Sequence, residues 1–151
     1  MRRALGVVLL AAAATACTST VAGSPVPAGG QGTDGQQALV KQYFTDLNDA
    51  AGEGPAAQRE FLRRTQHPDF TDRACDLGDL TLRIEPALST LRPDPRWKPE
   101  EATARPRGTT YVVGVSVRIR RDGSTLAEQI GSQRVVVLSG KAYGFTPCPT
   151  R

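Results

Sequence analysis

The spacing of apolar residues changes half-way along the chain, from a helical period to a strand period. In the first half, apolar side chains recur every three or four residues, as on the buried face of a helix. These positions are Leu39, Tyr43, Leu47 and Ala51. Asp34 is predicted to begin this helix, because it has capping-box spacing to a glutamine, and glycines just after Ala51 end it. A proline that suits a first helical turn predicts a second helix over residues 55–66, PAAQREFLRRTQ.

The middle of the chain has a less regular pattern. A His-Pro pair at residues 67–68 closes the second helix, because the residue before a proline is pushed out of helical geometry. Pro86 is expected to open a last helical turn. The proline-rich segment RPDPRWKP, residues 92–99, predicts a loop or a sheet edge, and a weak strand is expected over residues 97–104.

The second half alternates apolar and polar residues. The alternation from Tyr111 to Arg120 predicts a strand with one apolar face. An Asp-Gly pair then predicts a tight hairpin, after which a strand returns over residues 126–138 and a short last strand covers residues 141–145. Helices followed by a meander predict an α+β fold, in which N-terminal helices pack on a curved antiparallel sheet of three to four strands.

The N-terminus has the three-part pattern of a secretory signal peptide. Two arginines precede an apolar run, and small residues follow; the run is too short to span a bilayer. The alternative, a buried first helix, has nothing to pack with, because Ser-, Gly- and Pro-rich sequence comes next. Residues 1–16 are therefore predicted to be a signal peptide, residues 17–35 a flexible tether, and residues 36–151 a single α+β domain.

The end of the leader, Ala14-Thr15-Ala16-Cys17, resembles the lipobox of bacterial lipoproteins. In that family a small residue precedes a cysteine that is thioether-linked to diacylglycerol. The resemblance implies that Cys17 is lipidated and becomes the N-terminus, anchored in the cell membrane on its extracytoplasmic face. Two acyl chains are enough for stable anchoring. Alternatively, an ordinary signal peptidase could cut after Ala16 and release a soluble protein.

Three cysteines are present, at positions 17, 75 and 148. Export implies an oxidising compartment, in which thiols tend to pair. If the lipid takes Cys17, then Cys75 and Cys148 are left to form a structural disulfide. No metal site and no cofactor is expected, because the chain has no C-x-x-C motif and its single histidine, His67, is eight residues from Cys75.

Charge excludes one class of partner. The formal net charge is +4, of which the leader contributes two, so the remaining chain is too weakly basic to predict binding to nucleic acid. Four aspartates are spaced as on one side of a helix and are interpreted as a solvated face in preference to a cation site. They are Asp69, Asp72, Asp76 and Asp79.

Four arginines of the strand half could form a basic strip on the open face of the sheet. They are Arg118, Arg120, Arg121 and Arg134. Such a strip could meet anionic lipid headgroups or an acidic partner. The alternative is that these side chains only keep the surface soluble and protect an edge strand.

The order of elements resembles the cystatin-like cone of nuclear transport factor 2, a fold shared by polyketide cyclases and ketosteroid isomerases. The helix opening ALVKQYFTDLNDA is similar to that of such domains in exported actinobacterial lipoproteins, which also often have a cysteine shortly after the second helix. The resemblance covers about residues 36–148 and implies a conical pocket. Tyr43, Trp97 and Tyr111 could line that pocket, although core packing is the alternative role for Tyr43.

No catalytic residue is predicted. His67 is expected at a surface turn, and no motif for a nucleophile is present. The sequence favours a non-catalytic module, held at the membrane by its N-terminal lipid, that binds a hydrophobic small molecule or an envelope protein. The alternative is a small-molecule enzyme of the cyclase or isomerase type that uses the cone.

Overall fold

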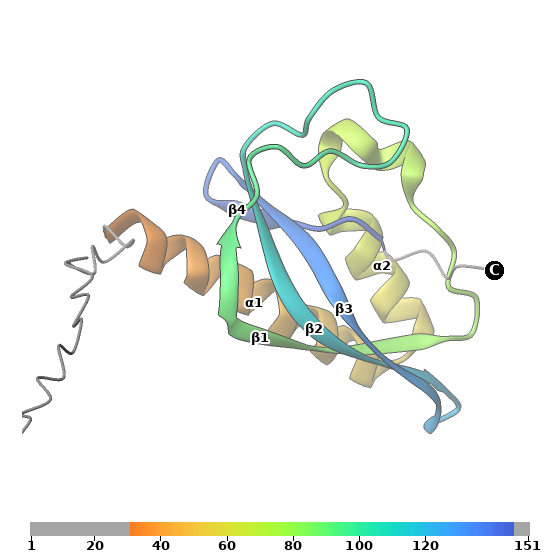
Figure 1. Ribbon diagram of the computed structural model, residues 1–151. Coiled ribbons are helices and arrows are strands. Elements are labelled where there is room, and N and C mark those ends of the chain that lie inside the picture. The colour runs from red at the N-terminus through yellow and green to blue at the C-terminus, as the bar shows by residue number, and fades with distance from the viewer. Residues whose placement is uncertain (1–30, 147–151) are drawn as a thin grey trace, which may run out of the picture.

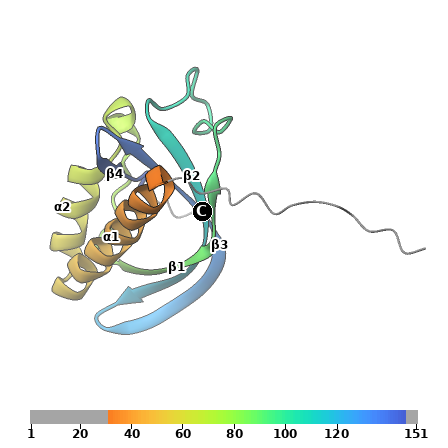
Figure 2. The same cartoon turned by 90° about the vertical axis from the view of Figure 1, so that its left-hand side faces the viewer.

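The computed structural model describes residues 31–146. Its elements are helices α1 (Gln31–Glu53) and α2 (Pro55–Thr65), the 3₁₀ helix η1 (Pro68–Arg73), and strands β1 (Thr81–Pro93), β2 (Thr109–Arg121), β3 (Ser124–Leu138) and β4 (Lys141–Tyr143). The strands form one antiparallel sheet in the order β1-β2-β3-β4. Both α-helices lie on the same face of this curved sheet (Figures 1 and 2). The predicted α+β class, with helices followed by an antiparallel sheet, is confirmed.

The two predicted α-helices are present, but the first begins earlier than expected. Asp34 lies in the first turn of α1, so its interpretation as a cap is wrong. Residues 31–35, which the sequence assigned to the tether, are helical. Gly54 separates the two helices with φ +123°, a conformation that residues with a Cβ rarely adopt.

The main core lies between α1 and the sheet. From α1, Val40, Phe44 and Leu47 are almost fully buried, and the sheet contributes Val113 and Val135 from its central strands. Burying one such side chain stabilises the fold by about 1.5–3 kcal/mol. The helical period of the first half and the alternation of the second half therefore meet in one apolar layer.

The connection between β1 and β2, residues 94–108, closes the other face of the sheet at one end (Figure 1). Val112 and Val136 are buried there, pointing away from the helices because side chains alternate along a strand. Asp94 holds the connection in place: its backbone N–H bonds the Thr110 carbonyl at 2.9 Å, and its carboxylate meets Arg134.

Two predictions for the middle of the chain are wrong. Pro86 does not open a helical turn but lies inside β1, and residues 97–104 form turns and not a strand. The physical reason for the first error is that β1 is an edge strand. Pro86 faces the outer edge of the sheet, where its missing N–H costs no ladder hydrogen bond.

Side-chain amides from the helices satisfy the outer edge of β1. Asn48 of α1 accepts from the Ile84 N–H at 2.8 Å and donates to the Ile84 carbonyl at 2.7 Å. Gln58 of α2 makes the same pair of bonds with Leu82, at 2.8 and 2.6 Å. Each amide stands in for the backbone of a neighbouring strand, so these buried peptide groups keep their hydrogen bonds.

We predict that Gln58→Met destabilises the fold by about 1–3 kcal/mol, because the Leu82 N–H and carbonyl would be left buried without a partner. Urea denaturation followed by circular dichroism measures the change. Gln42→Met is the matched control: Gln42 is exposed and bonds only Asp46, so its loss should shift stability by less than about 0.5 kcal/mol. Equal stability losses in the two variants would contradict this role for Gln58.

Candidate functional site

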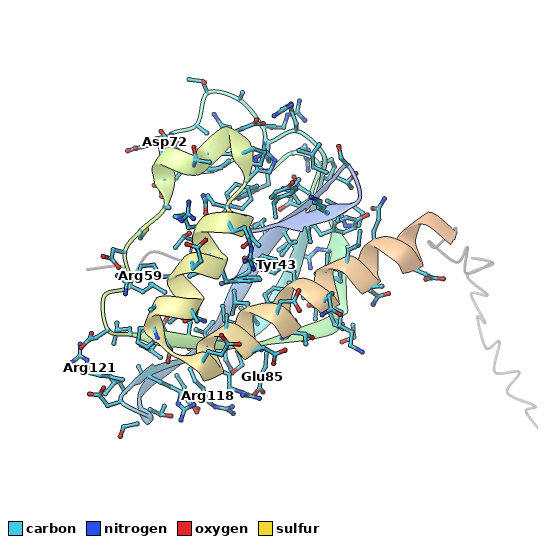
Figure 3. The ribbon with its side chains drawn as sticks, turned by 180° about the vertical axis from the view of Figure 1, so that it is seen from behind. Tyr43, Arg59, Asp72, Glu85, Arg118 and Arg121 are labelled. Carbon is cyan, nitrogen blue, oxygen red and sulfur yellow. The ribbon has the colours of Figure 1, made fainter. Side chains whose placement is uncertain are left out.

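The three residues predicted to line a pocket are not brought together around a chamber. Tyr43 and Tyr111 are both buried in the main core, 6% and 4% exposed. Figure 3 shows Tyr43 between α1 and the sheet. Trp97 lies outside this core, on the connection between β1 and β2, with its ring 4.8 Å from that of Phe145. Tyr43 therefore has the core-packing role that was the alternative to lining a pocket.

Tyr43 is held by aromatic rings and by the backbone that follows β4. Its ring centroid lies 5.4 Å from that of Phe44 and 5.6 Å from that of Phe61. Burial raises the pKa of its phenol to about 12, although a side-chain hydrogen bond with Thr65 lowers it in part. The hydroxyl lies so close to Gly144 that a Cβ atom there would overlap it. The phenol is thus a neutral packing group at physiological pH.

His67 is fully buried, so its expected position at a surface turn is wrong. Its Nδ1 accepts from the Asp69 N–H at 3.2 Å, which leaves the proton on Nε2, 2.9 Å from the Arg107 carbonyl oxygen. The ring is stacked on Phe145, with 9° between their planes. Burial is tolerated because backbone groups satisfy both nitrogens, and the imidazole joins η1 to the connection before β2.

The four aspartates do not share a helix face, because η1 ends at Arg73 and irregular chain follows. Asp69 forms an ion pair with Arg107 at 2.7 Å, and the hydrogen bonds from that guanidinium lower the pKa of the carboxyl. Asp79 pairs with Arg121 at 2.9 Å. Among residues 31–146, no group of three or more His, Cys, Asp or Glu side chains is placed to hold a metal ion.

Three of the four arginines of the predicted basic strip pair with carboxylates, and Arg120 donates to the Gly123 carbonyl at 2.6 Å. Arg118 lies between Glu85 and Glu128, at 2.9 and 2.7 Å, and Figure 3 shows it close to Glu85. Arg134 meets Asp94 at 3.4 Å and lies over the Trp97 ring. The outer face of the sheet therefore has charges of both signs in place of a row of free cations.

A shallow hollow of about 250 Å³ lies where the chain leaves β4. It is lined by Trp97, Ser132, Gln133, Arg134, Phe145 and Thr146. The guanidinium of Arg134 lies 5.5 Å from the centre of the Trp97 ring. Its apolar rings and one cation suit a side chain of a docked segment, and the hollow adjoins the middle of β3.

The outer edge of β3 is open beside this hollow. β4 pairs only with residues 136–138, and no other strand of the described chain pairs with that edge. Two large apolar side chains of residues 31–146 are exposed, and both lie on this part of β3: Leu126 at 54% and Ile130 at 92%. Such a strand edge is a template for pairing with another chain, so we take it, with the hollow, as the candidate functional site.

Sequence reasoning missed Leu126 and Ile130, although a signal was present. The predicted strand over residues 126–138 is far longer than the last strand that pairs with it. In the structure β3 has 15 residues and β4 has 3, so most of one edge has to lack a neighbour.

The cysteine predictions fall largely outside the described residues. Cys17 and Cys148 are not among residues 31–146, so lipidation and the Cys75–Cys148 disulfide stay predictions. Cys75 is half-buried and lines a hollow beside α2 together with Thr146, two residues before Cys148 in the sequence. The signal peptide also lies outside this range. None of the helices within residues 31–146 is long and apolar enough to cross a membrane.

Comparison of the chain with protein-family models, with characterised proteins and with solved structures found no match.

We predict that Gly144→Ala destabilises the domain by about 1–3 kcal/mol, because the new methyl group meets the Tyr43 phenol. The backbone cannot retreat, since Gly144 is hydrogen-bonded to both Thr65 and His67. Thermal and urea unfolding measure the loss. Gly35→Ala is the control: this helical glycine has no atom near a built Cβ, so alanine should stabilise by about 0.5–1 kcal/mol. Unchanged stability in Gly144→Ala would refute the close contact.

The raised pKa of Tyr43 predicts a loss of stability in alkali. The folded phenol ionises at about 12 and the unfolded one at 10.0, so its contribution is complete below pH 10 and falls as pH rises to 12. Over that window the loss is about 3 kcal/mol. Denaturation of the wild type and Tyr43→Phe at pH 9, 10 and 11 tests this. The stability difference should change with pH above 10, and a constant difference would contradict the buried phenol.

Proposed function

We propose that this chain is a lipid-anchored protein of the bacterial envelope whose domain, on the extracytoplasmic face, is a non-catalytic module that binds a protein partner. The leader and its Ala14-to-Cys17 ending support the anchor, through their resemblance to the lipobox. The tether that follows Cys17 would hold the domain off the membrane surface.

The observation that carries the choice of a protein partner is the packed space between the helices and the sheet. Phe44 and Leu47 of α1 fill the side of the sheet where a cone would hold a ligand. Tyr43 and Tyr111, the side chains expected to face such a ligand, are part of this packing. An enzyme of the cyclase or isomerase type would need that space, so we do not propose this alternative.

Surface features support a protein partner over a hydrophobic small molecule. The large apolar side chains that are exposed lie on a strand edge, which a polypeptide can extend through backbone hydrogen bonds. The hollow at Trp97 is shallow and opens beside that edge, as a pocket for one side chain of a bound segment would.

We predict that the full chain, made in a bacterium with its own leader, is found in the membrane fraction with a diacylglyceryl group on Cys17. Cys17→Ala should move it from that fraction, because the thioether can no longer form. Intact-mass measurement of both proteins gives the modification directly. Native mass spectrometry of the wild type should then show no tightly held small molecule beyond the lipid.

Two results would contradict the proposal separately. An unmodified soluble wild-type protein would remove the anchor. A stoichiometric small molecule that stays bound until Tyr43 or Tyr111 is replaced would show that the interior opens, and would favour a ligand-binding domain. Ser89→Ala is a suitable control, because it alters an exposed residue of β1 outside the predicted lipobox.

A further inference from the structure

The two edges of the sheet differ in whether their outward peptide groups have hydrogen-bond partners. On β1, the peptide groups that face outward belong to Leu82 and Ile84, and Gln58 and Asn48 bind them. The next outward position is Pro86, which has no N–H to offer. A further chain is thereby excluded from the first half of this edge, as proteins commonly arrange for exposed sheet edges.

On β3, the outward peptide groups between residues 128 and 134 have no such protection. Leu138 and Lys141 flank a two-residue turn and form a hydrogen-bonded pair, so Leu138 faces β4. Because direction alternates along a strand, even-numbered residues between 128 and 136 also face that side. The segment from Glu128 to Gln133 contains neither lysine nor proline. Its centre, Ile130, is 92% exposed.

We propose that this edge pairs with β3 of a second copy of the chain, antiparallel, with the two-fold axis at Ile130. The sheets of the two copies would join into one of eight strands, since each contributes four. The inference rests on the proposed function in that it names the protein partner, but it does not depend on the lipid anchor. A two-fold axis makes each contact occur twice.

This register covers the more exposed of the two apolar side chains. Ile130, 92% exposed, lies against Ile130 of the second copy on the outer face of the sheet. Leu126 lies at a register shift, where Ile119 pairs with Ala127 and Arg120 with Thr125, so it does not follow the alternation of the paired segment. The side chain that a monomer leaves most exposed to water would thus be paired with an apolar side chain.

Charge also suits pairing with a second copy. Glu128, which pairs with Arg118 at 2.7 Å within its own copy, comes opposite Ser132 of the second copy and diagonal to its Arg134, so Arg134 would join an existing ion pair. The Arg134 guanidinium can turn toward Glu128 of the second copy, because its two contacts with Asp94 are long, both 3.4 Å. In this register no two like charges face each other.

Neighbouring registers are less suitable. An axis at Gly131 would place each Ile130 opposite Ser132 of the second copy, so the two apolar side chains would not meet. An axis at Gln129 would place Ile130 opposite the Glu128 carboxylate of the second copy, which is bound to Arg118. The axis at Ile130 therefore combines the free length of the edge with apolar and charge complementarity.

Cysteine cross-linking of the full chain tests the axis. In a hydrogen-bonded antiparallel pair the Cα atoms are about 5.5 Å apart, within disulfide range. Ile130→Cys should give a dimer on a non-reducing gel, in most of the protein under mild oxidation. Thr125→Cys is the control: it is exposed on the same strand, but its two copies would be about 33 Å apart and should not cross-link above wild type.

Sedimentation equilibrium of the purified full chain provides the second measurement. Ile130→Lys sets two ammonium groups together on the axis and should raise the dimer dissociation constant at least tenfold. Ser89→Lys, the same charge on the exposed face of β1, should leave it unchanged. Circular dichroism and melting of each variant confirm that it is folded. Ser132→Pro removes one outward N–H from the edge and gives an independent disruption.

Three results would overturn the proposal. They are a monomeric wild type at all accessible concentrations, equal cross-linking at positions 125 and 130, and a dimer that Ile130→Lys and Ser132→Pro both leave intact. A fourth such result is cross-linking of Ile130→Cys to a different envelope protein with none to itself, which would overturn self-pairing but not the choice of a protein partner. The lipid on Cys17 and the packed, ligand-free interior are measured independently, so failure of the dimer leaves both proposals standing.

Discussion

The packing of α1 against the concave face of the sheet is the contact on which the rest of the structure depends. Phe44 and Leu47 fill the space between the helix and the sheet. On the same face of α1, the Tyr43 hydroxyl lies against the backbone of Gly144. Gly144 is also hydrogen-bonded to Thr65 and His67, so the path of the chain after β4 is fixed at this point. Because this space is packed with side chains, we place the proposed interaction on the surface of the domain.

The same helices decide which edge of the sheet is available. Asn48 and Gln58 come from the ends of α1 and α2 that lie over β1, and their amides take the place of a fifth strand. Among the helix side chains that the structure describes, none forms such hydrogen bonds with the middle of β3, and β4 pairs only with residues 136–138. One edge is therefore closed by side chains and the other is open to a polypeptide.

The sequence predicts the local elements better than the site. Period alone identifies α2, β2 and both hairpins, because these follow from side-chain alternation and from turn residues such as Asp122 and Gly123. Prediction from the period fails where contacts with distant parts of the chain determine the structure. Pro86 fits in a strand because it faces the sheet edge. His67 can be buried because backbone groups of other residues bond both of its ring nitrogens. Tyr43 was a pocket candidate for its chemistry, yet packing determines its role. The open edge of β3 depends on relative strand lengths, which residue types do not reveal.

Hydrogen–deuterium exchange of the full chain, followed residue by residue at two protein concentrations, distinguishes a closed from an open sheet edge. We expect slow exchange of the Leu82 and Ile84 amides at both concentrations, because side-chain amides hold them within the fold. The Ile130 and Ser132 amides should exchange quickly in dilute solution and slowly in concentrated solution. Fast exchange at Ile130 and Ser132 that does not depend on concentration, or fast exchange at Leu82 and Ile84, would contradict the contrast between a closed and an open edge.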